Sequence, residues 1–318
     1  MSRLPNLFIV GAPKSGTTSI YEYLQGHPEA FLPEFKEPSY FAPDLALDRS
    51  GNFLRYPEDD ELYRALFADA GGAKVVGEGS TRYLYSKSAP GLIHAAQPEA
   101  RIVVNVRNPV QMIHSLHAHK VAAGTEDLTD FEAALAAETD RHAGNRVPQH
   151  SNPRLATYRD RAYFGEQLSR WFAEFGRDRV HVIVFEDLVA DTPAVFRELL
   201  QFLGIDPDYQ PQSFGARNEA HRARSKWVRA LMLSRPVQFV GWRVLPRILG
   251  DARARSLARG ISRSRLSRQP YERPKVGSEL ARRLEADFAA DVALLSELLG
   301  RDMAALWFGG SRVSPTSP

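Results

Sequence analysis

A run of glycine, lysine and hydroxyl residues near the N-terminus is the first feature of the sequence that could do chemistry. Residues 8–19 read FIVGAPKSGTTS, an apolar stretch followed by two glycines, a lysine and several hydroxyl residues. A loop between a strand and a helix presents unpaired N–H groups and the positive end of the helix dipole, which suit a phosphate. We therefore expect an anion-binding loop whose contacts come from Lys14, Ser15, Gly16, Thr17, Thr18 and Ser19.

The position of the lysine separates this loop from the common nucleotide-binding loop. The Walker A pattern G-x-x-x-x-G-K-[ST] places its lysine directly after the second glycine. Here Lys14 comes two residues before Gly16, and Thr17 follows that glycine. The loop is predicted to hold a phosphate-type group in a way that differs from ATPases and kinases. The alternative is an ordinary tight turn with a surface lysine.

A second anion site is predicted after the apolar run RIVVNV at 101–106. Arg107 would emerge where this strand ends, and Ser115 lies about two turns into the helix that follows. An arginine offers forked donors that suit a phosphate. The two residues are therefore expected to bind a second phosphate, although Arg107 taken alone could equally cap a helix or form a salt bridge.

These loops need a scaffold, and the alternation of apolar runs with helical patterns predicts one. The strand candidates are 7–10, 74–76, 101–106 and 181–185, and the helix candidates are 17–25, 109–124, 193–203 and 277–299. Such alternation predicts an α/β fold, a P-loop-like parallel sheet flanked by helices on both faces. Ligands in these folds lie at the carboxyl ends of the strands. The loops after Val10, Val106 and Phe185 are therefore expected to form the site.

The composition of the chain limits the chemistry further. It has 318 residues, a net charge of +3 and no cysteine, which excludes disulfides, thiolate metal sites and cysteine nucleophiles. No apolar run is long enough for a signal peptide or a membrane span, so a cytoplasmic protein is expected. We expect a single domain over 1–308 and a disordered tail at 309–318.

Taken together, these motifs resemble the sulfotransferases that use 3′-phosphoadenosine-5′-phosphosulfate (PAPS), most closely the carbohydrate and heparan-sulfate-type branch and related bacterial proteins. APKSGTTS looks like their 5′-phosphosulfate loop, and RNPVQMIHS looks like their 3′-phosphate motif. FKEPSYFA (35–42) and GEGSTRYL (77–84) are similar to two further segments of that branch, and the pattern ending LLGRDMAALW is similar to its C-terminus. The resemblance covers nearly the whole chain.

The resemblance implies an enzyme that moves a sulfuryl group from PAPS to a hydroxyl acceptor and releases adenosine 3′,5′-bisphosphate. The acceptor would be a sugar, a hydroxylated lipid or a secondary metabolite. Lys14 would stabilise the leaving phosphate, and Glu37 would be the base that takes the acceptor proton. His114 or His117 is an alternative base, and a surface pairing of Glu37 with Lys36 is the structural alternative. No metal is expected.

The sequence departs from the family pattern in three places. Gly79 stands where the heparan-type branch has a lysine, so any role of that lysine is absent or relocated. The lysine-glycine-arginine loop before the last helix is replaced by QPYERPKVG (269–277), where Arg273 or Lys275 could substitute. The threonine-histidine-leucine-proline segment of cytosolic small-molecule sulfotransferases is missing.

The positive charge is concentrated in one segment. Residues 217–275 contain 16 Lys and Arg against 3 Asp and Glu, whereas the rest of the chain is acidic. This mainly helical segment is predicted to be a lid on the acceptor side, an outer helical layer, or, through 226–249, a peripheral membrane contact. No nucleic-acid motif accompanies the charge, so a nucleic-acid partner is not expected. The oligomeric state cannot be inferred.

Two other functions remain open from the residues alone. One is a nucleotide-dependent kinase, in which the carboxylates of FED (185–187) would hold Mg²⁺. The other is a non-catalytic module that binds an adenosine bisphosphate. The displaced lysine argues against the first, and Glu37 beside the loop argues against the second.

Overall fold

The computed structural model describes residues 4–46, 60–148, 151–214 and 276–309, with the backbone of 221–223 and 268–270. The chain forms two compact units. The first consists of Met1–Asn218 together with Val276–Pro318, and the second is Glu219–Lys275. The described part of the second unit is an antiparallel pair, β6 (His221–Ala223) with β7 (Arg268–Pro270). The rest of the basic segment 217–275, with Arg273, Lys275 and 226–249, and the tail after Gly309 lie outside the described residues. The predictions made for them stay predictions.

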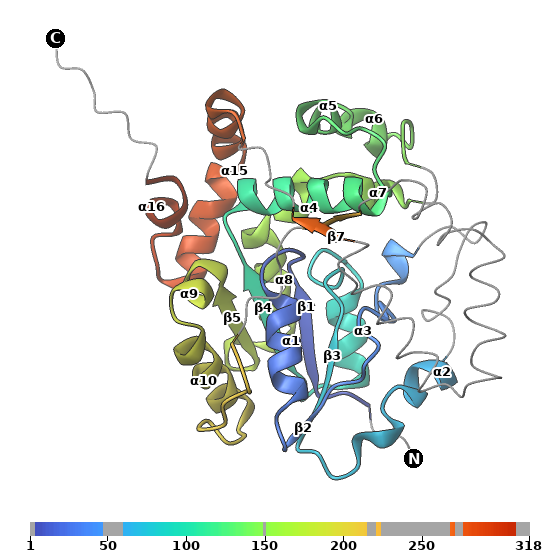
Figure 1. Ribbon diagram of the computed structural model, residues 1–318, viewed down its shortest axis with the longest axis vertical. Coiled ribbons are helices and arrows are strands. Elements are labelled where there is room, and N and C mark those ends of the chain that lie inside the picture. The colour runs from blue at the N-terminus through green and yellow to red at the C-terminus, as the bar shows by residue number, and fades with distance from the viewer. Residues whose placement is uncertain are drawn as a thin grey trace. The chain divides into compact units, whose positions relative to one another are not determined.

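The first unit is built on a five-stranded parallel sheet in the order β2-β3-β1-β4-β5 (Figure 1). Its strands are β1 (Leu7–Gly11), β2 (Ala30–Phe31), β3 (Val75–Gly79), β4 (Arg101–Val106) and β5 (Val180–Val184). β1 lies at the centre between β3 and β4. The loop after β1 is therefore flanked by the loops after its two neighbours.

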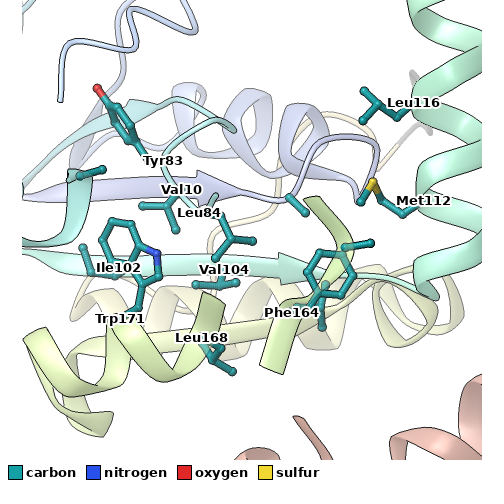
Figure 2. Packing of buried hydrophobic residues seen from close by; sticks show 14 of the residues in the cluster. Val10, Tyr83, Leu84, Ile102, Val104, Met112, Leu116, Phe164, Leu168 and Trp171 are labelled. Carbon is teal, nitrogen blue, oxygen red and sulfur yellow. The ribbon is translucent and has the colours of Figure 1, made fainter. Parts of the chain in front are cut away.

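Helices cover both faces of this sheet, as the sequence predicts. Alternate β-strand side chains point to opposite faces, and Leu7, Ile9 and Val103 pack under α1 (Thr17–Gln25) and α10 (Thr192–Leu203). Phe8, Val10, Ile102 and Val104 face the other way. They pack with α3 (Ala89–Ala96), α4 (Pro109–Ala123), α8 (Phe164–Phe175) and α15 (Ser278–Leu299). Figure 2 shows part of this second layer, where Trp171 and Leu168 of α8 lie against β4.

Shorter elements complete the described part of this unit. They are the helices α2 (Asp60–Ala65), α5 (Phe131–Ala136), α6 (Glu138–His142), α7 (Pro153–Ala156), α9 (Phe185–Ala190) and α16 (Met303–Phe308), and the 3₁₀ turns η1 (Pro43–Leu45), η3 (Ala68–Ala70), η4 (Arg159–Ala162) and η5 (Arg177–Arg179). In the described ranges, no helix has both the length and the apolar character needed to cross a membrane.

The helix that follows β4 shows how local signals fix the site. The Asn108 side chain accepts a hydrogen bond of 3.1 Å from the backbone N–H of Gln111, and Pro109 occupies the first helical position. The helix ends at Gly124, which adopts the left-handed conformation. Asn108 and Pro109 determine where the helix begins, and Arg107 directly precedes the Asn108 cap.

Candidate active site

The loop between β1 and α1 has a backbone that few residues could adopt. Gly16, at the N-cap of α1, has φ of 88°, and a Cβ added there would lie 2.7 Å from Cδ2 of Leu188. Glycine is therefore required at this position both for conformation and for space. Ser15 and Thr17 are buried on either side of it, and Lys14 also has positive φ, at 63°. The loop precedes the first turn of α1. There the N–H of Ser19 donates to the carbonyl oxygen of Gly16 at 3.0 Å, whereas those of Thr17 and Thr18 have no backbone partner within the described ranges.

Arg107 lies against this loop. Its Nη1 donates a hydrogen bond of 3.0 Å to the carbonyl oxygen of Lys14, and its Nη2 donates one of 3.2 Å to Oε1 of Gln111. The guanidinium also lies over the ring of Phe185, at 4.3 Å from the centroid. The two anion-binding elements predicted from sequence are therefore in direct contact.

Ser115 is on the same face of α4 as Gln111, because residues four apart on a helix are neighbours. It is 1% exposed, and its Oγ has no hydrogen-bond partner among the residues that the structure describes. A buried hydroxyl without a partner is costly unless a ligand or water satisfies it. A phosphate oxygen would satisfy this hydroxyl, so Ser115 fits the predicted second phosphate site.

Glu37 is held by the residues at the end of β3. Its backbone N–H donates to the carbonyl oxygen of Gly79 at 2.9 Å, and its φ is 66°. Its Oε2 accepts hydrogen bonds from the backbone N–H and the hydroxyl of Thr81, at 2.8 and 3.2 Å. No hydrogen bond to Oε1 occurs within the described ranges. The carboxylate is thus oriented through one oxygen, and the other is left for a further partner.

A buried carboxylate lies beneath the segment that carries Glu37. Glu78 is 1% exposed and accepts hydrogen bonds from the hydroxyls of Ser80 and Tyr63, at 2.6 and 2.7 Å, and from Tyr83 at 3.1 Å. Burial raises the pKa of Glu78 to about 7, and these three hydrogen bonds oppose part of that rise. The oxygen of Ser80 also accepts a hydrogen bond of 2.9 Å from the backbone N–H of Ser39.

Basic residues from separate elements surround the carboxylate of Glu37. Arg82 follows β3, Arg161 belongs to η4, and both attract Glu37 electrostatically. Burial lowers the pKa of Arg161 to about 10, and repulsion from Arg82 adds to this effect. Burial also lowers the pKa of Lys120 on α4 to about 7, with repulsion from Arg161 contributing. Arg82 and Arg161 therefore place positive charge near Glu37.

The residues of the competing hypotheses have other partners. Oε1 of Glu186 accepts from the backbone N–H of Asn108 at 3.2 Å, Oε2 accepts from Trp307 at 3.0 Å, and Asp187 pairs with Arg301. His117 is 4% exposed, and its Nε2 lies 2.8 Å from the carbonyl oxygen of Leu128. In the part of the chain that the structure describes, no group of three or more metal-ligating side chains converges.

The structure brings together most of the residues that the sequence singled out, and it adds others. Lys14, Ser15, Gly16, Thr17, Thr18 and Ser19 form the loop and the first turn of α1, with Arg107 against the loop. Lys36, next to Glu37, reaches the hydroxyls of Thr17 and Thr18. Sequence reasoning assigned no role to Glu78, Arg82, Arg161 and Asn105, a β4 residue whose buried side-chain amide has no partner in the described ranges. The sequence signal that could have identified Asn105 and Glu78 is a polar residue within an apolar strand.

The fold and this site define a P-loop-like α/β protein with a glycine-containing loop between its central strand and α1. The sulfotransferase family model matches residues 5–210, and the chain belongs to the sulfotransferase family. The resemblance inferred from the motifs is confirmed. A crystal structure of a sulfotransferase from Alicyclobacillus acidocaldarius is similar over 96% of this chain and 99% of that one, with a TM-score of 0.70 and 28% identity.

Curated relatives come from the carbohydrate branch. Human carbohydrate sulfotransferase 15 is 24% identical over 256 residues, covering 64% of this chain and 44% of that protein. Human heparan sulfate glucosamine 3-O-sulfotransferase 6 is 28% identical over 204 residues, covering 64% of this chain and 53% of that protein. The chain thus spans about half the length of the curated relatives that it matches.

Proposed function

We propose that the protein transfers a sulfuryl group from PAPS to a hydroxyl group of an acceptor and releases adenosine 3′,5′-bisphosphate. The contact between Arg107 and the carbonyl oxygen of Lys14 carries this proposal. It joins the two anion-binding elements into one site, as a donor with two separate phosphate groups requires. The unpartnered hydroxyl of buried Ser115 supports the same assignment.

The loop and α4 would bind different ends of the PAPS donor. Lys14, the loop N–H groups and the hydroxyls of Thr17, Thr18 and Ser19 would bind the 5′-phosphosulfate end, with Ser15 and Gly16 shaping the backbone. Arg107 and Ser115 would bind the 3′-phosphate. The donor supplies the sulfuryl group, and the protein supplies position and charge.

Glu37 would take the proton of the acceptor hydroxyl as the new oxygen–sulfur bond forms. The bond between sulfur and the 5′-phosphate oxygen breaks, and its electron pair remains on that oxygen. Lys14 would stabilise the resulting negative charge. The hydrogen bonds from Thr81 orient Glu37 for this role, and its Oε1 is the oxygen left for the acceptor.

Two measurements test the proposal. Adenosine 3′,5′-bisphosphate should raise the melting temperature more than ATP with Mg²⁺, and labelled PAPS should transfer its label to at least one hydroxyl acceptor. Greater stabilisation by ATP with Mg²⁺ would favour a kinase, which the pairing of Asp187 with Arg301 does not support. Bisphosphate binding without transfer to sugars, hydroxylated lipids or secondary metabolites would favour the non-catalytic module.

A sugar hydroxyl is the acceptor that the relatives favour, because they are named as sulfotransferases of carbohydrate and of heparan sulfate. The acceptor panel should therefore begin with glycans. A cytoplasmic location, a peripheral membrane contact through 226–249 and a single domain over 1–308 remain predictions, as does the lack of a nucleic-acid partner.

A further inference from the structure

Lys36 reaches from the segment before Glu37 to the first turn of α1. Its Nζ donates hydrogen bonds to the hydroxyl oxygens of Thr18 and Thr17, at 3.1 and 3.4 Å. Both threonines belong to the turn whose unpaired N–H groups are expected to face the donor. The ammonium group therefore lies at the anion-binding end of the helix.

This position is electrostatically unfavourable unless an anion is present. The N-terminus of an α-helix carries about half a positive charge, so a cation beside it is repelled. Burial lowers the pKa of Lys36, and attraction from Glu37 and then Glu22 opposes that shift. Within the described part of the chain no carboxylate forms an ion pair with Lys36, whose partners there are the two hydroxyls and the ring of Tyr21, 5.5 Å away. Among the described residues, this partly buried ammonium is therefore attracted by nearby carboxylates but is not in direct contact with one.

The lack of a side chain at Gly79 explains how Lys36 reaches this place. A Cβ at position 79 would lie 3.2 Å from Cε of Lys36 and 2.8 Å from Cδ2 of Tyr21. The aliphatic part of Lys36 therefore occupies the space above the end of β3 that a larger residue would need. The glycine and the lysine form one arrangement, in which the missing side chain allows the neighbouring cation to approach α1.

We propose that Lys36 is a second catalytic cation, which contacts the sulfuryl end of the donor beside Lys14. This inference rests on the proposed function. As the bond from sulfur to the 5′-phosphate oxygen breaks, Lys36 keeps its proton and stabilises the negative charge shared by the sulfuryl and phosphate oxygens. The acceptor proton still goes to Glu37, so the two adjacent residues 36 and 37 have separate roles.

A charge-removing substitution tests this inference. Lys36→Met keeps the length of the side chain and removes the charge. Turnover should fall at least about 100-fold, the usual cost of losing one donor that stabilises developing charge. Affinity for adenosine 3′,5′-bisphosphate, which has no sulfuryl group, should change less than about tenfold. The matched control is Lys87→Met at an exposed lysine, which should keep wild-type turnover.

Lys36→Arg separates charge from mere packing. Arginine keeps the positive charge, so this variant should retain at least about ten times the turnover of Lys36→Met. Equal losses in the two variants, or turnover of Lys36→Met within about threefold of wild type, would overturn the role of Lys36. Melting temperatures measured for both variants show whether each is folded at the assay temperature.

The same assays separate this inference from the function on which it rests. If the wild-type protein transfers no label from PAPS, the proposed function is wrong. If the wild-type protein is active and Lys36→Met is equally active, only the role of Lys36 is wrong.

Discussion

The hydroxyl of Tyr63 donates a hydrogen bond of 2.7 Å to Glu78, directly beneath the segment that carries Glu37. Glu78 also accepts hydrogen bonds from the hydroxyls of Ser80 and Tyr83. The oxygens of these hydroxyls in turn accept hydrogen bonds from the backbone N–H groups of Ser39 and Phe41, at 2.9 and 3.2 Å. A hydroxyl has one proton to donate, so the carboxylate of Glu78 fixes the direction of both hydroxyls. The buried carboxylate thereby positions the segment on which Glu37 sits.

Glu78 should make the stability of the protein depend on pH. Its pKa is about 7 in the folded state against an ordinary 4.5, so between these values the folded state keeps a proton that the unfolded chain has lost. The contribution of Glu78 to the free energy of unfolding is complete below pH 4.5. It is lost as the pH rises to about 7, which lowers the free energy of unfolding by up to ~3 kcal/mol. Urea unfolding of Glu78→Gln between pH 4.5 and 8 should show a smaller decrease than wild type. Glu61→Gln, an exposed control on α2, should keep the wild-type dependence, and an unchanged slope in Glu78→Gln would contradict the assignment.

Glu37→Gln should lower turnover at least about 100-fold, because an amide cannot accept the acceptor proton. The amide oxygen can still accept the hydrogen bonds from Thr81, so the melting temperature should change little. Initial rates of transfer from labelled PAPS check the first expectation, and a thermal melt checks the second. Near-normal turnover in a folded variant would remove Glu37 from the mechanism.

Arg107→Ala should weaken the binding of adenosine 3′,5′-bisphosphate about 10- to 100-fold, the range expected for lost hydrogen bonds to a charged group. Titration calorimetry measures this directly. Arg197→Ala is a suitable control, because Arg197 pairs with Asp208 on the exposed side of α10. Unchanged affinity in Arg107→Ala would show that the second phosphate is held elsewhere.

Gly16→Ala should destabilise the protein by about 1–3 kcal/mol, because alanine is strained at a φ of 88° and its methyl group would collide with Leu188. Gly91 in α3 is the matched control. A Cβ there would meet no atom within 4 Å, so Gly91→Ala should be neutral or stabilising by up to about 1 kcal/mol. Denaturant unfolding of the two variants gives the comparison, and equal stabilities would refute the conformational argument.

The parts of the fold that depend on local signals could be predicted from the sequence. The bounds expected for 17–25 and 101–106 are those of α1 and β4. Gly16 and Gly26 flank the first, and the second is a mostly apolar run that ends three residues before Pro109. The strand expected at 74–76 is longer in the structure, where it spans Val75–Gly79. Gly77 and Gly79 interrupt the β-pattern of the sequence, but pairing with the neighbouring strands extends the strand through them. The two residues of β2 form a strand only through pairing with β3, and a run of two carries no periodic signal.

The site was predictable to the extent that its residues belong to contiguous motifs. The loop at 14–19 and the pair Arg107 and Ser115 have recognisable spacing, and the structure joins the first loop to Arg107. The contact of Lys36 with Thr18 depends on how the segment after β2 packs beside α1, which no local pattern encodes. The approach of Arg161 to Glu37 depends likewise on long-range packing of η4.

The strand order has a consequence for redesigning this protein. Glu37 with Thr81 and Arg82 is associated with β3 on one side of the central strand, whereas Arg107 and Ser115 follow β4 on the other side. If Glu37 takes the acceptor proton as proposed, libraries that vary residues on the β3 side would search for new acceptors while the β4 side is left untouched. Lys36 and Thr18 should stay unchanged in such libraries, because their hydrogen bond links the β3 side to the first turn of α1.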